Sequence, residues 1–168
     1  MKGLCLGLVI GALSIGAARA QTAEPIDHWN TGAVLAALQT LQASNIQQLT
    51  SEGRTVITAR TRDGLNVALY AKACDPAPPS VEAICHGLEA VISFDPGSKA
   101  DRKALADRLN HAFALGKFLA EPDGSIRLSR YLDFDGSVSP ANLRAELAGL
   151  FTVGVLTSQT LWLKPAKR

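Results

Sequence analysis

The order of apolar and polar positions divides the chain into helical and extended segments. From Thr31 to Ala43, apolar side chains recur at spacings of three and four, which predicts an amphipathic helix. The period then changes to two: apolar and polar residues alternate over Val56–Arg62 and again over Leu65–Lys72, a pattern typical of half-buried strands. Asp63-Gly64 between them suits the positive φ angles of a tight turn. These two runs therefore predict an antiparallel hairpin.

The second half of the chain repeats this change of period. Leu88–Phe94 alternates as a strand, and Ser98–Phe113 returns to helical spacing. The apolar runs around Pro122-Asp123-Gly124 predict a second hairpin, and Ser139-Pro140 is typical of a helix start. With a weak strand at Ile46–Thr50, the order is helix, three or four strands, helix, two strands, helix. No long parallel crossover is needed, so the predicted class is α+β with an antiparallel sheet.

The first twenty residues have a different character. Lys2 precedes an apolar run that is too short for a permanent membrane helix. The small residues Ala18 and Ala20 suit signal peptidase. We expect a cleavable signal over residues 1–20, cut between Ala20 and Gln21, and a periplasmic or secreted mature chain. An uncleaved anchor is the alternative.

The remaining sequence predicts one domain. Residues 21–30 are polar and irregular, which predicts a flexible lead, and residues 164–168 form a basic tail. The single domain is expected over 31–163, with no stable membrane span in the mature chain. Loss of the signal leaves 15 basic and 15 acidic residues, and this neutral balance argues against binding to nucleic acid. Aromatic residues are sparse, so an aliphatic core is expected.

Two cysteines survive signal cleavage, Cys74 and Cys85. An even pair in an oxidising compartment predicts a disulfide. The alternative is a metal or redox pair, but ten intervening residues fit neither a zinc knuckle nor a Cys-x-x-Cys motif.

The sequence offers little chemistry for catalysis or metal binding. His28, His86 and His111 lack the spacing of a metal site, and Gly-x-Ser-x-Gly is absent. Asp133 and Asp135 suggest a carboxylate pair or calcium loop, but a turn explains them better. We therefore expect no enzyme, no metal site and no cofactor.

Arginines mark the first candidate surface for a partner. Arg54, Arg60 and Arg62 share one strand face if the alternation continues, and they would suit an acidic partner. The alternative is an ordinary solvated face.

A second candidate surface lies in the C-terminal segment, which is apolar on more faces than a helix needs to cover a sheet. A protein partner or a second copy of the chain could bind there, and the alternative is burial within the domain. The residues of this candidate surface are Phe151, Val155, Leu161 and Trp162.

Several of these motifs together resemble the YbjN-like family, which is described as bacterial sensory transduction regulators. The similarity covers Thr31 to Leu156, and the chain departs from the family pattern at Leu109-Asn110 and Gly136-Ser137. The motifs that carry the resemblance are Asp63-Gly64, Cys74, Cys85, Gly116-Lys117-Phe118-Leu119, Asp123-Gly124 and Gly136-Ser137-Val138-Ser139.

The resemblance implies a fold like that of type III secretion chaperones, with a twisted antiparallel sheet backed by helices. It also implies a binding or regulatory role without enzymatic activity. We expect an exported protein-binding or regulatory module whose protein partner is unknown, and a homodimer is left open. The alternatives are a structural envelope protein without a specific ligand, or a small-ligand-binding protein or enzyme.

Overall fold

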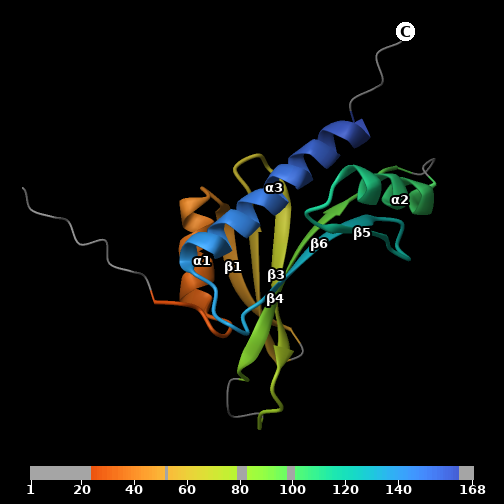
Figure 1. Ribbon diagram of the computed structural model, residues 1–168. Coiled ribbons are helices and arrows are strands. Elements are labelled where there is room, and N and C mark those ends of the chain that lie inside the picture. The colour runs from red at the N-terminus through yellow and green to blue at the C-terminus, as the bar shows by residue number, and fades with distance from the viewer. Residues whose placement is uncertain (1–23, 52, 79–82, 98–100, 163–168) are drawn as a thin grey trace, which may run out of the picture.

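The computed structural model describes residues 24–51, 53–78, 83–97 and 101–162, with side chains described as far as Leu161. The predicted signal sequence and basic tail lie outside these residues. In the described part, three helices and one six-stranded sheet form an α+β fold, which confirms the predicted class and the optional first strand (Figure 1). The elements are α1 (Thr31–Thr40), β1 (Ser44–Ser51), β2 (Arg54–Arg60), β3 (Asn66–Cys74), β4 (Cys85–Phe94), α2 (Arg102–Ala112), β5 (Lys117–Ala120), β6 (Ile126–Asp133) and α3 (Pro140–Trp162).

The sheet is antiparallel throughout, in the order β1-β2-β3-β4-β6-β5. The predicted hairpin around Asp63-Gly64 forms, with Ile57 opposite Leu69. After β4 the chain passes through α2 and β5 before β6 returns to pair with β4. This return leaves β5 at one edge of the sheet and β1 at the other.

One face of the sheet and all three helices share a single hydrophobic core. In Figure 1, α3 crosses the sheet beside α1, and α2 lies next to β5. No described helix is long and apolar enough to cross a membrane. The largest fully buried side chains are Phe118, Phe134, Leu38, Ile57, Leu69, Leu88, Ile92, Ile126, Leu128, Leu143, Leu147 and Leu150.

Local side-chain chemistry sets the helix ends. The Ser139 hydroxyl accepts a hydrogen bond from the backbone N–H of Asn142 at 3.1 Å, so the predicted cap of α3 forms. The carboxylate of Asp101 accepts from Ala104 N–H and caps α2, which begins at Arg102; the predicted start at Ser98 lies outside the described residues. Helix α1 ends at Thr40, before the predicted Ala43, since Gln42 has a left-handed φ of 57°.

The described part of the predicted lead is packed against the domain. Ile26 and Trp29 are buried, although polar residues surround them in the sequence. Ile26 pairs with Val138 through two backbone hydrogen bonds of 2.9 and 2.8 Å, and Trp29 N–H donates to the carbonyl of Cys85. The sequence predicted that the domain starts at Thr31, but the packed part of the chain begins earlier.

Candidate functional site

The second face of the sheet carries no helix in the part of the chain that the structure describes. We call it the open face. Val56 and Val91 lie on it and are buried by neighbouring side chains, yet they do not belong to the core cluster. Strand alternation and register assign to the open face Gln47, Leu49, Arg54, Val56, Thr58, Arg60, Ala68, Tyr70, Lys72, Glu89, Val91, Ser93, Arg127, Ser129 and Tyr131.

A hollow of about 470 Å³ lies over β1 to β4 on the open face. Side chains with hydroxyl, amide and guanidinium groups line much of it. The polar lining residues are Asn45, Gln47, Thr58, Arg60, Asn66, Tyr70 and Ser93.

Next to the hollow, a row of aromatic and charged side chains crosses three strands. Tyr70 lies opposite Glu89, and Glu89 lies opposite Tyr131. These are the two tyrosines of the chain, and both lie on the open face. Lys72 Nζ lies 3.1 Å from Glu89 Oε2 and 5.4 Å from the centre of the Tyr70 ring, and Arg127 Nη1 lies 3.6 Å from Glu89 Oε1. The carboxylate of Glu89 is therefore held between two cations.

Tyr131 is the most exposed aromatic side chain of this row, with 51% of its surface exposed. Its ring lies along β4 over Gly87, where an added Cβ would clash with the Tyr131 hydroxyl. Partial burial raises the pKa of Tyr131, and the charges of Asp133 and Asp135 raise it further. The phenol therefore keeps its proton at neutral pH and is available as a hydrogen-bond donor.

The three predicted arginines do not share one face. Arg54 and Arg60 are exposed at the two ends of β2, and within the described residues neither forms an ion pair. Arg62 lies beyond the end of β2 in the turn, where it lines a recess with Thr40 and Phe151 from the helices. Strand alternation stops at Arg60, so it no longer determines where Arg62 points.

The later hairpin also sends its arginines to opposite faces. Arg127 lies on the open face, where its Nε is 2.7 Å from Glu121 Oε1. Arg130 lies on the helix side, where its guanidinium contacts Glu146 of α3 at 2.7 Å and donates to the Leu115 carbonyl at 2.9 Å. Arg130 therefore links β6 to α3 and to the segment before β5.

The predicted apolar surface of the last helix is only partly on the surface. Phe151 is 7% exposed and belongs to the core, so the prediction for this residue was wrong. Leu161 packs against the core, and Val155 is partly exposed. The side chain of Trp162 lies outside the described residues. The sheet requires Phe151 for its own cover because α3 is the main helix over β4 and β6.

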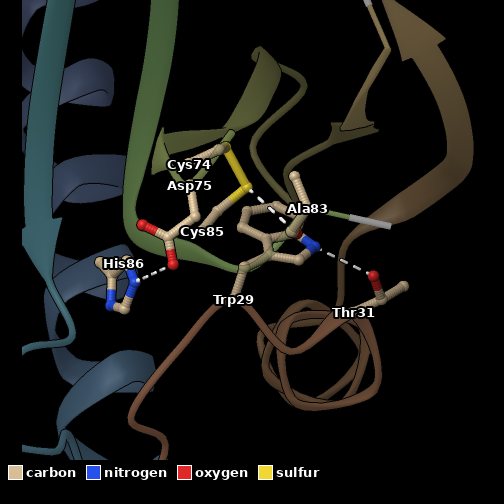
Figure 2. The surroundings of a disulfide bond; sticks show 7 residues. All are labelled: Trp29, Thr31, Cys74, Asp75, Ala83, Cys85 and His86. Carbon is tan, nitrogen blue, oxygen red and sulfur yellow. Dashed lines mark hydrogen bonds and ion pairs between the residues drawn. A yellow bond between two sulfur atoms is a disulfide. The ribbon is translucent and has the colours of Figure 1, made fainter. Parts of the chain in front are cut away.

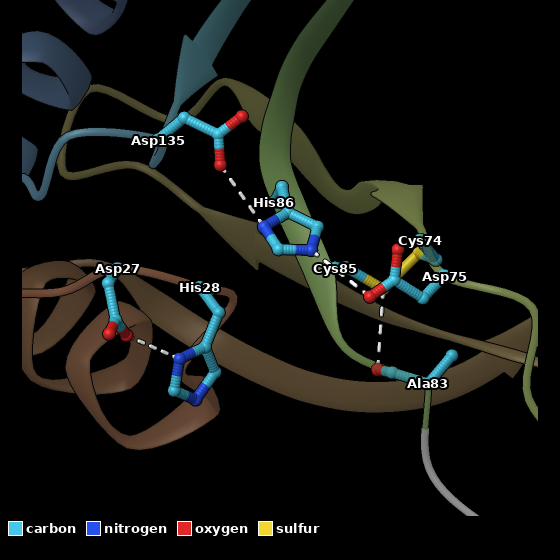
Figure 3. Close-up of polar contacts among 8 residues, drawn as sticks. All are labelled: Asp27, His28, Cys74, Asp75, Ala83, Cys85, His86 and Asp135. Carbon is cyan, nitrogen blue, oxygen red and sulfur yellow. Dashed lines mark hydrogen bonds and ion pairs between the residues drawn. A yellow bond between two sulfur atoms is a disulfide. The ribbon is translucent and has the colours of Figure 1, made fainter.

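A polar cluster lies beside the disulfide at the end of the sheet (Figures 2 and 3). The predicted bond between Cys74 and Cys85 is confirmed, and it joins directly opposed residues of β3 and β4. The neighbouring His86 places Nε2 3.3 Å from Asp75 and Nδ1 3.1 Å from Asp135. One imidazole thus bridges the segment after β3 and the segment after β6.

This arrangement suits a structural clamp better than catalysis or metal binding. The side chain of His86 contacts two carboxylates and, within the described residues, no nucleophile that it could activate. No group of three or more His, Cys, Asp or Glu side chains in the described residues is placed to hold a metal ion. Sequence spacing could not reveal the cluster, since its members come from three separate segments.

The His86 clamp predicts a pH dependence of stability. The hydrogen bond to Asp75 raises the pKa of His86 above its ordinary 6.5, burial opposes this, and the charges of Asp75 and Asp135 add to it. A pKa that is higher in the folded state stabilises the protein fully below about pH 6.5. That contribution is lost as pH rises through the folded-state pKa.

We expect His86→Gln to reduce the fall in urea midpoint between pH 5.5 and pH 8.5. His111→Gln, on the outer side of α2, is the matched control and should retain the wild-type pH dependence. An unchanged pH dependence in His86→Gln would show that the clamp does not contribute.

Comparison with known proteins adds little to this description. No family model matches the sequence, and no curated protein matches it either. A solved structure of an uncharacterized protein from Methanothermobacter thermautotrophicus is similar, with a TM-score of 0.49 and 9% sequence identity. The similarity covers 77% of this chain and 94% of that one.

Proposed function

We propose that this chain is an exported, non-enzymatic module that binds a protein partner on its open face. The observation that carries the proposal is the distribution of side chains on the sheet: both tyrosines and two arginines without ion pairs in the described residues lie on the face that the described helices leave uncovered. Tyr and Arg are, with Trp, the residue types most enriched among those that dominate protein interfaces.

The chemistry of the face favours a protein over a catalytic substrate. Tyr131 offers an exposed ring beside the fixed carboxylate of Glu89, and Arg60 offers a guanidinium at the hollow. These groups bind and orient, and no pair of them forms the nucleophile and base that covalent catalysis requires. The resemblance to the YbjN-like family supports the same role, in which the module binds or regulates.

An exported location fits the sequence and the disulfide together. The predicted signal over residues 1–20 directs the chain out of the cytoplasm. The bond between Cys74 and Cys85 is of the kind that persists in an oxidising compartment. We therefore place the module in the periplasm or the medium. The alternative is a structural envelope protein without a specific ligand.

Site-specific photo-cross-linking in producing cells tests this function. A photoreactive residue replaces Thr58 or Tyr131 on the open face, and Gln39 or Arg108 on the helices in two matched controls. We expect the two open-face positions to capture the same protein and the two helix positions to capture none, because a partner on the open face is beyond their reach. Equal capture from all four positions would contradict the proposal. Failure of both open-face positions to capture any protein would favour the structural alternative.

A further inference from the structure

The two edge strands of the sheet, β5 and β1, differ in whether other groups cover their outer backbone. Strand β5 has four residues, and α2 packs beside it. The Asn110 side chain of this helix donates to the Phe118 carbonyl at 2.9 Å and accepts from the Phe118 N–H at 2.8 Å. One amide therefore occupies the backbone groups that another strand would otherwise use. The β5 edge is closed.

The β1 edge is open within the described residues. Seven of the eight residues of β1 are exposed, and only Ile46 is partly covered. The strand Ser44–Ser51 has no charged residue and no proline, which are common devices that keep foreign strands away from an edge. A bulge at Asn45, where φ is 50°, interrupts the pairing with β2, and regular register runs from Gln47 to Ser51. These five residues present alternate backbone N–H and C=O groups outward.

Positive charge lies at both ends of this edge. On β2, Arg54 lies opposite Ser51 and Arg60 lies opposite Ser44. The Arg60 guanidinium lies beside Gly64 in the turn after β2, and this exposed side chain can turn past the small Ser44 toward the edge. Neighbouring strands are about 4.8 Å apart, which puts a further strand about 10 Å from β2. Arginine and glutamate side chains that extend toward each other span this distance. Among the described residues Arg54 and Arg60 have no acidic partner of their own.

From these observations we infer that β1 accepts an extended acidic segment of a partner protein as a seventh strand. This inference rests on the proposed function and names the chemistry of the partner. Main-chain hydrogen bonds along Gln47–Ser51 hold the segment, and carboxylates near its two ends pair with Arg54 and Arg60 and set its register.

Charge complementarity favours an acidic segment over a second copy of the chain. If two β1 strands paired antiparallel, Ser44 of one copy would lie near Ser51 of the other. Arg60 of the first copy would then approach Arg54 of the second. The two β2 strands of such a pair would lie about 14 Å apart, so the like charges oppose the dimer only weakly, and the dimer offers the arginines no acidic partner. A strand with a carboxylate at each end replaces this repulsion with attraction.

The test uses the mature protein and a labelled seven-residue peptide that alternates Val with Thr and carries Glu at both ends. Its two Glu residues are six positions apart, as are Arg54 and Arg60. We expect binding in fluorescence anisotropy at low salt and about tenfold weaker binding when Lys replaces both Glu. Arg54→Gln with Arg60→Gln should weaken binding by a similar factor, and the control Arg62→Gln should leave it unchanged.

Two further measurements test the strand geometry. N-methylation of alternate peptide residues, on the edge that faces β1, should abolish binding, whereas methylation on the other edge should not. Hydrogen exchange should show protection of Gln47–Ser51 when the Glu peptide is bound. Equal binding of the Lys peptide, indifference to methylation, or protection of β1 through self-association would each overturn the inference.

The outcomes separate this inference from the proposed function. Capture of one partner from Thr58 and Tyr131, without protection of β1 in the resulting complex, would overturn the seventh strand and leave the open face as the binding site. Binding of the Glu peptide with protection of β1, but no capture from the open-face positions, would support the strand and overturn the proposed site.

Discussion

Replacing Phe134 by Ala should lower the free energy of unfolding by about 3–5 kcal/mol, the usual loss for a large aromatic side chain removed from a core. Phe134 is fully buried, although it lies between two exposed aspartates just after β6. Its N–H also donates to the carbonyl of His86, so the backbone has little freedom to close the cavity. Urea denaturation of the mature protein measures the change.

Two matched variants serve as controls for Phe134→Ala. Phe134→Leu keeps most of the apolar volume and should cost much less than Phe134→Ala. Tyr131→Ala removes an exposed aromatic side chain only three residues away and should change stability by about 1 kcal/mol or less. A loss below about 1 kcal/mol for Phe134→Ala would show that the turn does not hold the ring in the core.

Removing the disulfide should lower the free energy of unfolding by about 3 kcal/mol, because the unfolded chain regains the freedom that the closed loop denies it. The variant replaces both Cys74 and Cys85 by Ala, and the two cysteines are 11 positions apart. Three prolines, Pro76, Pro78 and Pro79, already restrict the unfolded loop, so the loss should lie at or below this value.

Reductant provides the control for the disulfide variant. The wild-type urea midpoint should fall when dithiothreitol is added, and the midpoint of the Ala variant should not respond. Thiol labelling of the exported wild-type protein should find no free cysteine. Two labelled thiols, or equal stability of wild type and variant without reductant, would contradict the prediction.

Much of the fold could be predicted because its signals are local. The change from helical to two-residue period marks each element, and Asp63-Gly64 and the Ser139 cap act through neighbouring backbone atoms. The disulfide also follows from sequence, because the two cysteines that remain after the predicted signal have one possible intramolecular pairing. Errors at the helix ends came from single residues such as Gln42, whose left-handed conformation leaves no repeating pattern.

The candidate site could be predicted only in part. Alternation placed Arg54 and Arg60 on one face of a strand, and there the prediction agrees with the structure. Alternation failed for Arg62, which lies past the end of the strand. The excess of apolar residues in the last helix suggested a binding role for Phe151, but this side chain is buried in the core. Residue type alone could not tell a binding residue from a structural one, since the same side chain can serve in either role.

The sequence by itself thus determined the elements, their order and the covalent bond between Cys74 and Cys85. The tertiary structure alone decided which face of the sheet stays open, which edge Asn110 closes, and that His86 lies between Asp75 and Asp135. Periodicity reports the environment of a residue relative to its near neighbours along the chain. The site depends on strand order and on contacts between distant segments, and these are set only when the whole core packs.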